Sequence, residues 1–112
     1  MHRSVLTLDT HRDTLALLEI PGWSIPDRHD AKRDFSQVDV PRMKQGHIDG
    51  GFWAIYTPQG PQTQAAVRAA RAAAIMRGVA IREMVAANPR LFALVNGAAD
   101  AAKIAASGRI QV

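Results

Sequence analysis

The sequence predicts an α/β fold with a parallel sheet, and three observations support this prediction. Segments rich in β-branched and aromatic residues alternate along the chain with segments of helical periodicity. Turn-forming Pro and Gly residues separate most of these segments. Hydrophobic residues make up 47% and charged residues 21% of the 112 positions, which is ordinary usage for a globular protein. A folded domain with a core is therefore compatible with both length and composition.

The first predicted element is a short strand over residues 4–8, SVLTL, which contains β-prone Val and Thr. The polar cluster 9–13 follows it at once, so we expect polar side chains at the carboxyl end of this strand. Residues 14–36 are expected to form a long irregular loop, because Pro21-Gly22 is a turn signal and the charged stretch RHDAKRD follows. A loop of this length is typical of a functional segment or a lid.

A short helix and a second strand are predicted next. Asp39 is placed as the N-cap, Pro41 lies in the first turn, and Gly46 provides the stop signal. The aromatic and β-branched run 52–56, FWAIY, ends before Pro58 and predicts a second, buried strand.

The second half of the chain is dominated by an Ala-rich helix expected from residue 62 to about 87, ended by Asn88-Pro89. Its positions at spacings of three and four predict one small-residue face: Ala66, Ala69, Ala73, Met76, Ala80, Met84 and Ala87. We place Arg68, Arg71 and Arg82 on the opposite, solvent-facing side.

Three short elements complete the expected order. Residues 91–95 form an apolar extended run, residues 97–107 a second Ala-rich helix with Gly108 as its C-cap, and residues 109–112, RIQV, the start of a further strand. A strand that opens this close to residue 112 predicts that the chain is one incomplete domain, residues 1–112, to which more protein belongs.

Charge and composition exclude several classes of function. The net charge of +4 and the sequence pI near 10.3 would fit a nucleic-acid binder, but the basic residues are scattered without a dense cluster, so we expect no nucleic-acid partner. No apolar run approaches the roughly 18 residues that a membrane helix needs, and we expect any signal peptide to be absent or already removed. The compartment stays open, with the cytoplasm as the default and the periplasm as the alternative. The absence of cysteine leaves His and carboxylates as candidate metal ligands.

His11 and Asp13 are the candidate metal ligands. Two residues apart, they would project to the same side of an extended chain with Cα atoms about 6.5 Å apart. An imidazole nitrogen and a carboxylate oxygen both bind zinc, and the carboxyl end of an α/β strand is where barrels hold their active sites. By themselves the two residues also fit an ordinary surface turn. His2, His29 and His47 have no comparable partner spacing and are expected to be solvated loop histidines.

Three blocks of sequence carry a resemblance to a known family. The pair lies in LDTHRDT, which is followed by QVDVPRMKQGHIDGGFWAIYTP and later by DAAKIAASGRIQV. In order and spacing these blocks resemble the first strand, the first helix with the second strand, and the approach to the third strand of the renal (membrane) dipeptidase family of zinc metallopeptidases. Related amidohydrolases usually carry His-x-His on the first strand, so Asp13 favours the dipeptidase branch. The chain departs from the family at Gly51, where many members have Gln.

The resemblance implies a partial (β/α)8 TIM-type barrel of the metal-dependent hydrolase kind, with only the first two to three βα units present. It implies two zinc ions as cofactors in the full-length family member, dipeptides as substrates, and allows a homodimer at full length. His11 and Asp13 would bind one zinc, while the bridging glutamate would lie just past Val112. The sequence assigns no catalytic residue and leaves substrate-binding residues unknown. We therefore expect the 112-residue chain to be inactive alone.

Two other functions remain open at this point. A small basic domain that binds nucleic acid or an acidic protein would explain the Arg-bearing Ala-rich helices and would show salt-sensitive binding. A fragment of another metal-dependent amidohydrolase, acting on a cyclic amide or ester, would differ from a dipeptidase only in the downstream ligands.

Overall fold

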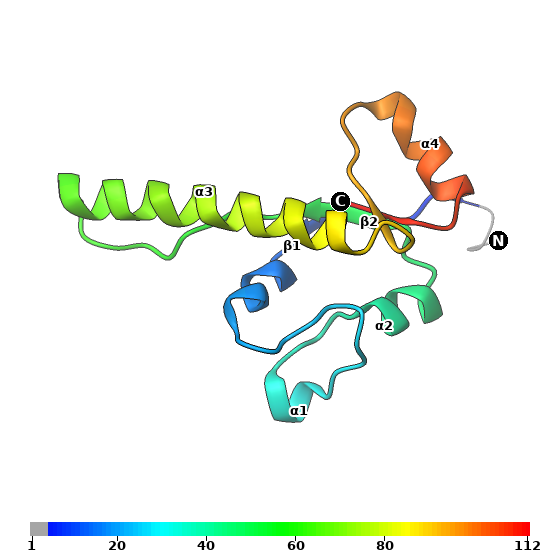
Figure 1. Ribbon diagram of the computed structural model, residues 1–112, viewed down its shortest axis with the longest axis horizontal. Coiled ribbons are helices and arrows are strands. Elements are labelled where there is room, and N and C mark those ends of the chain that lie inside the picture. The colour runs from blue at the N-terminus through cyan, green and yellow to red at the C-terminus, as the bar shows by residue number, and fades with distance from the viewer. Residues whose placement is uncertain (1–4) are drawn as a thin grey trace.

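The computed structural model describes residues 5–112, so Ser4, the first residue of the predicted strand 4–8, and His2 lie outside the described residues. Helices and strands alternate along the chain (Figure 1). The elements are β1 (Leu8–Arg12), the 3-10 helix η2 (Thr14–Glu19), α1 (Ala31–Asp34), α2 (Val40–Gln45), β2 (Gly50–Trp53), α3 (Gln64–Ala87), β3 (Phe92–Ala93), α4 (Ala98–Ala106) and β4 (Ile110–Gln111).

The strands form one parallel four-stranded sheet in the order β1-β2-β4-β3. This confirms the predicted α/β class with a parallel sheet. The expected extended run 91–95 contributes β3, which pairs with β4 through Phe92–Ile110 and Ala93–Gln111. β4 inserts between β2 and β3 because the connection through α4 returns the chain to the edge of β2.

The first two predicted strands are shifted in the structure. The first is β1, residues 8–12, rather than 4–8, so most of the polar cluster 9–13 lies within the strand instead of after it. The second is β2, residues 50–53, rather than 52–56. The physical reason at β2 is close backbone approach: a Cβ at Gly50 would lie 2.4 Å from Gln111 Cβ, so only glycine lets β2 and β4 pair there.

The predicted helices are confirmed with small shifts in their ends. Asp39 caps α2 by accepting a hydrogen bond from the Arg42 amide, and Thr63 caps α3 through the Ala66 amide. The C-cap of α4 is Ser107 rather than the predicted Gly108, which follows it with a positive φ of 73°. The long loop expected over residues 14–36 is wrong in part, because it contains η2 and α1.

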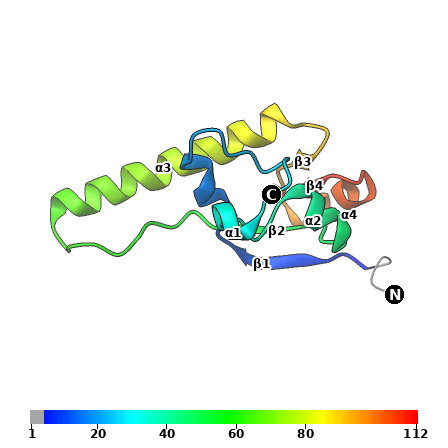
Figure 2. The same ribbon diagram turned by 90° about the horizontal axis from the view of Figure 1, so that it is seen from below.

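The buried face of α3 differs from the predicted small-residue face. Its amino-terminal half extends beyond the sheet (Figures 1 and 2), and burial is confined to the later turns. The side chains that α3 buries are Arg77, Ile81, Met84 and Val85, whereas Ala69, Ala73, Met76 and Ala87 are exposed. The larger apolar side chains, and not the alanines, therefore define the inner stripe, since each removes more apolar area from water.

The core lies where η2, α2 and the last turns of α3 meet the sheet. Phe92 is only 1% exposed and packs edge-on against Trp53, with ring centroids 6.4 Å apart. The buried hydrophobic cluster consists of Leu15, Ile25, Val40, Met43, Trp53, Ile81, Met84, Val85, Phe92 and Ile110. Trp53 confirms the expected strand packing. Tyr56, for which strand packing was also expected, lies beyond β2 and is 43% exposed.

Candidate metal site

His11 and Asp13 come together at the carboxyl end of β1. His11 is the fourth residue of the strand, and Asp13 directly follows it as the N-cap residue of η2. The His11 Nε2 and Asp13 Oδ1 atoms are 3.1 Å apart, and the side chains are 71% and 56% exposed. Asp13 has helical rather than extended dihedral angles, φ −93° and ψ −4°, so the chain turns between the two residues. The pair thus converges on one point at an open surface.

The geometry of this pair fits two ligands of one zinc ion. Zinc binds imidazole nitrogen and carboxylate oxygen at about 2.0 to 2.2 Å, so two tetrahedral ligands are about 3.4 Å apart. The observed 3.1 Å between Nε2 and Oδ1 is a hydrogen-bond contact between the two side chains, and it brings both donor atoms within reach of one ion. Within residues 5–112, no group of three or more His, Asp or Glu side chains lies close enough to hold a metal. Among the described residues, His11 and Asp13 are thus a pair of candidate ligands without a third.

Arg12, between the two candidate ligands, points the other way and is 4% exposed. Its guanidinium lies over the Trp53 ring, 4.8 Å from the centroid, and donates to Met43 Sδ and to Asp9. Burial lowers the pKa of Arg12, although the adjacent Asp9 carboxylate opposes that effect. No local pattern predicted this burial, because the environment of Arg12 depends on β2 and α2.

Asp9 is held ionised by its hydrogen bonds. The backbone N–H of His11 donates to Asp9 Oδ1 at 3.1 Å, and this bond is the largest cause of the lowered pKa of Asp9; the Arg12 charge adds to it, while partial burial opposes it. The carboxylate thus forms the local side-chain-to-backbone turn expected of an Asx residue. Both Asp9 oxygens accept hydrogen bonds, Oδ1 from the His11 N–H and Oδ2 from the Arg12 guanidinium, so the carboxylate links these two neighbouring residues.

The remaining histidines in the described chain have other surroundings. His29 is not a solvated loop histidine as expected: its side chain is 10% exposed and stacks on Trp23 with ring centroids 5.0 Å apart. Its ring nitrogens face the Ser24 carbonyl and the Asp34 carboxylate. The bond to Ser24 and, next, the bond to Asp34 raise the pKa of His29 against the effect of burial. His47 is partly buried after α2 with a positive φ of 51°.

Arg77 joins α3 to two segments that follow β1 and β2. It is 8% exposed and donates to the Tyr56 carbonyl and to Glu19 Oε1, while its guanidinium lies 5.0 Å from the centroid of the Tyr56 ring. Sequence reasoning missed this residue, because an arginine in an Ala-rich helix resembles its solvent-facing neighbours Arg68 and Arg71.

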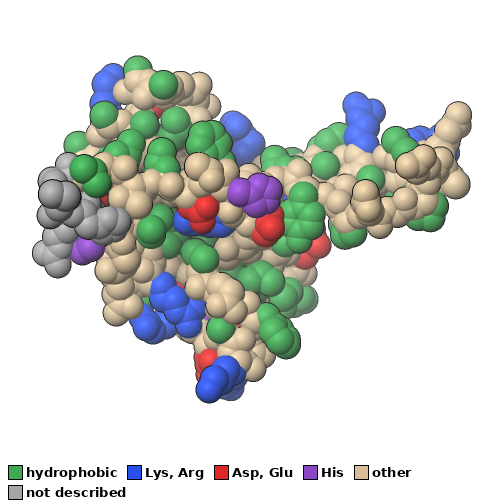
Figure 3. Space-filling model, turned by 180° about the vertical axis from the view of Figure 1, so that it is seen from behind, with side chains coloured by type: hydrophobic (Ala, Val, Ile, Leu, Met, Phe, Trp, Pro, Cys, Tyr) green, Lys and Arg blue, Asp and Glu red, His purple; other side chains and the backbone are tan. Residues whose placement is uncertain are grey.

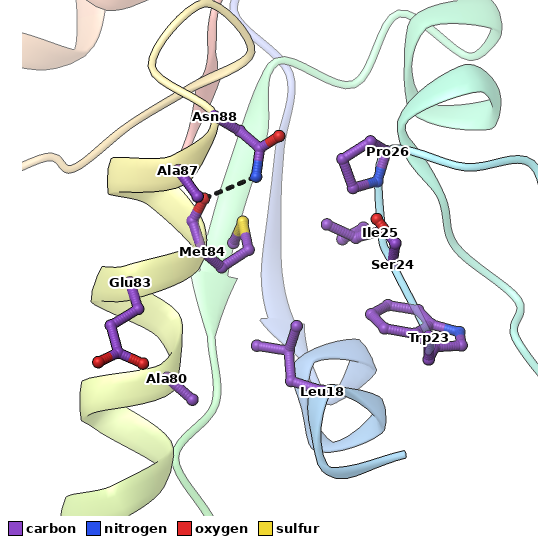
Figure 4. A pocket seen from close by; sticks show the side chains of 10 residues that line it. All are labelled: Leu18, Trp23, Ser24, Ile25, Pro26, Ala80, Glu83, Met84, Ala87 and Asn88. Carbon is purple, nitrogen blue, oxygen red and sulfur yellow. Dashed lines mark hydrogen bonds between the residues drawn. The ribbon is translucent and has the colours of Figure 1, made fainter. Parts of the chain in front are cut away.

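Pockets lie away from the candidate ligands. One of about 350 Å³ opens between the loop after η2 and α3; Figure 4 shows Met84 reaching from α3 toward Ile25, with Glu83 directed away. A larger one of about 880 Å³ is lined mainly by apolar residues of β2, α3 and the segment before α4. Neither is lined by His11 or Asp13.

The surface charge does not form a single basic patch on the face that Figure 3 shows. There, acidic side chains and a histidine gather near the middle, and Lys and Arg side chains are scattered around them. In the described chain, residues 5–112, no helix is both long and apolar enough to span a membrane.

Comparison with known proteins gives one consistent result. The family model "Membrane dipeptidase (Peptidase family M19)" matches residues 1–112. A curated relative, "Dipeptidase ataJ" of Aspergillus terreus, is 32% identical over 78 residues, which cover 66% of this chain and 19% of that protein.

Two solved structures are similar in both fold and sequence. The metallopeptidase of Rhodobacter sphaeroides, liganded with a phosphinate mimic of the dipeptide L-Ala-D-Ala, has a TM-score of 0.72 and 25% identity over 96% of this chain and 36% of its own. The dipeptidase AC, a metallopeptidase of family M19, has a TM-score of 0.72 and 28% identity over 96% of this chain and 33% of its own. The chain thus spans about a third of the length of these structures and a smaller share of the fungal relative. The family model covers the whole sequence, and the chain belongs to the membrane dipeptidase family, peptidase family M19.

Proposed function

We propose that this chain is the first part of a zinc-dependent dipeptidase, in which His11 and Asp13 are two ligands of one metal ion. The observation that carries the proposal is the convergence of His11 Nε2 and Asp13 Oδ1, 3.1 Å apart, at the carboxyl end of the first parallel strand. In a family of metallopeptidases, a nitrogen and an oxygen donor that meet at this place support a metal-binding role.

The chemistry of the donors favours zinc. A neutral imidazole and a carboxylate, without thiolates, are ligands typical of catalytic rather than purely structural zinc sites. Zinc, when bound, supplies an activated water at neutral pH and polarises the scissile carbonyl. Here the chain's own part is to hold one nitrogen and one oxygen donor on open surface, where a substrate can approach.

We propose a dipeptide as the substrate. Support comes from the Rhodobacter sphaeroides relative, which is liganded with a phosphinate mimic of L-Ala-D-Ala, and from the fungal relative described as a dipeptidase. The exposed position of the pair agrees with a small substrate that must reach the metal directly.

We further propose that residues 1–112 form one incomplete domain, the first βα units of a (β/α)8 barrel that holds two zinc ions at full length. The chain aligns with about a third of each solved relative, and a complete barrel takes about 250 residues. Because a catalytic zinc site uses three or more protein ligands and this stretch offers two, the isolated chain should have no appreciable dipeptidase activity.

The metal-binding part of the proposal can be tested by NMR on the 112-residue chain. We expect zinc to shift the His11 side-chain and Asp13 backbone signals in a saturable manner, and H11A and D13N each to abolish those shifts. H47Q serves as the matched control, because His47 lies after α2 and should leave the response unchanged. A wild-type titration without shifts at His11, or with shifts that survive both substitutions, would refute the assignment.

The catalytic part needs a separate assay. Purified 112-residue chain, saturated with zinc, is incubated with L-Ala-D-Ala and with a set of L,L-dipeptides, and released amino acids are quantified. We expect no release above that of H11A. Hydrolysis by the wild-type chain that H11A lacks would overturn the proposal that the chain is inactive alone.

A further inference from the structure

Between two paired positions, β1 contains one more residue than the matching stretch of β2. Asp9 lies opposite Gly51 and Arg12 lies opposite Trp53. Between these pairs β1 has Thr10 and His11, whereas β2 has only Phe52. Two residues opposite one define a β-bulge, a feature that bends a strand, re-aims a side chain and is frequent beside active sites.

The bulge decides which way the side chains around the metal pair point. In a regular strand, Asp9 and Arg12 would lie on opposite faces because they are three residues apart. Instead they face the same side, and the Arg12 guanidinium lies 3.3 Å from Asp9 Oδ2. Arg12 is thereby buried, while its neighbour His11 stays 71% exposed and meets Asp13. In a regular strand His11 would share the face of Asp9, so the extra residue places Arg12 instead of His11 on the side of the Asp9 carboxylate.

The Asp9 side chain provides a hydrogen-bond acceptor for the backbone N–H of the bulged residue His11. A bulged residue leaves the ladder, so its backbone N–H loses its partner on the neighbouring strand. Here the His11 N–H donates to Asp9 Oδ1 at 3.1 Å, and Asp9 Oδ2 accepts from Nε and an Nη of Arg12 at 3.3 Å. One carboxylate thus contacts both residues whose directions the bulge changes.

Gly51 lets the two strands come close at the start of the bulge. A Cβ at Gly51 would lie 2.5 Å from the Asp9 carbonyl oxygen, which is nearer than van der Waals contact allows. The backbone of β1 is therefore held tightly against β2 at Asp9 and leaves regular register only after it.

We propose that Asp9 is a positioning residue: it stabilises the β-bulge at Thr10 and His11 and so directs the His11 imidazole toward Asp13. This inference rests on the proposed function, because it assigns to His11 a direction that matters for metal binding. It adds a residue that does not touch the metal and acts through the His11 backbone.

Two substitutions separate the acceptor role of Asp9 from its charge. D9N keeps a short side-chain oxygen for the His11 N–H and removes the charge next to Arg12, whereas D9E keeps the charge and moves the oxygens one methylene away. D30E is the matched control, because Asp30 accepts from the backbone N–H two residues ahead in the same way, at the N-cap of α1. Circular dichroism verifies that each variant is folded, and D9A is added as a third variant that lacks both roles.

Two NMR readouts test the proposal, one without metal and one with it. In the metal-free chain we expect faster hydrogen exchange of the His11 amide in D9E and D9A, and near wild-type exchange in D9N. In the zinc titration we expect D9E and D9A to weaken binding about 10-fold or more, as loss of a residue that orients a metal ligand does. D30E should resemble the wild type in both readouts.

The outcomes distinguish the two proposals. If the wild type binds zinc and D9E binds it equally well with an unchanged His11 amide, the positioning role is wrong and the metal site stands. If the wild type shows no zinc binding while D9E loses the His11 amide protection, the metal assignment fails and the role of Asp9 in the bulge stands. Loss of both signals in D30E as well would overturn the positioning role, because the effect would then be general destabilisation.

Discussion

Asp39 allows a test of how α2 is held to the loop that precedes α1. Its carboxylate is fully buried, with 0% exposure. It accepts hydrogen bonds from the Arg42 amide at 2.8 Å and the His29 amide at 2.9 Å, and its Oδ2 lies 2.9 Å from Arg42 Nη1. D39A removes the N-cap of α2 and the link from this helix to the loop before α1 in a single step.

The expected loss follows from these three contacts. Loss of an N-cap costs about 1 kcal/mol. A backbone donor left without its partner in a partly buried place, here that of His29, costs about 1 to 3 kcal/mol. The ion pair with Arg42, whose side chain is 30% exposed, adds at most about 1 kcal/mol because solvent screens it. We therefore expect D39A to lower the free energy of unfolding by about 2 to 5 kcal/mol.

Urea unfolding followed by circular dichroism measures this loss. T63A is the matched control: Thr63 caps the longer helix α3 through one hydrogen bond of 3.2 Å at an exposed position, so its loss should stay near or below about 1 kcal/mol. A D39A loss no larger than that of T63A would contradict the reasoning, since burial and the additional donor would then contribute nothing.

Two further predictions use the same unfolding assay. The pKa of His29 is raised in the folded chain by Ser24 and Asp34, so its contribution is fully present below the unfolded pKa of about 6.5 and is lost as the pH rises through the higher folded pKa. The stability difference between the wild type and H29Q should therefore be larger at a pH of about 5.5 than at about 8.5; an equal difference at both would refute the linkage. G50A should destabilise by about 1 to 3 kcal/mol, because the new Cβ would lie 2.4 Å from Gln111 Cβ and force β2 away from β4. G60A, where nothing lies within 4 Å, should be close to neutral, and equal losses in the two variants would argue against this tight strand contact.

The chain's local patterns predicted α2, α3 and α4, but they missed η2 and α1. Capping chemistry is encoded within a few residues, so Asp39 and Gly46 could be recognised as the ends of α2 without any knowledge of the sheet. Strand ends were less accurate, because the limits of β1 and β2 are set by pairing partners distant in sequence. The glycines at 50 and 51 belong to a strand only because Gln111 and Asp9 approach them closely.

The sequence likewise predicted part of the candidate site. The spacing of two residues, together with the family resemblance of the surrounding sequence, nominated His11 and Asp13, and the structure brings their side chains together. The sequence did not indicate the bulge, the helical turn at Asp13 or the burial of Arg12. These depend on the register of β1 against β2 and on the position of Met43 in α2, which no local pattern contains.

The sequence by itself determined the α/β class, the helices α2, α3 and α4, the pair of candidate ligands and the family of the chain. Tertiary structure alone decided the strand order β1-β2-β4-β3, the inner face of α3, and the direction in which the residues of β1 point. The physical reason is the range of the interactions involved. Caps and helical periodicity act over three or four residues, whereas register, bulges and burial arise when segments some forty residues apart exclude water from one another, as β1 and β2 do.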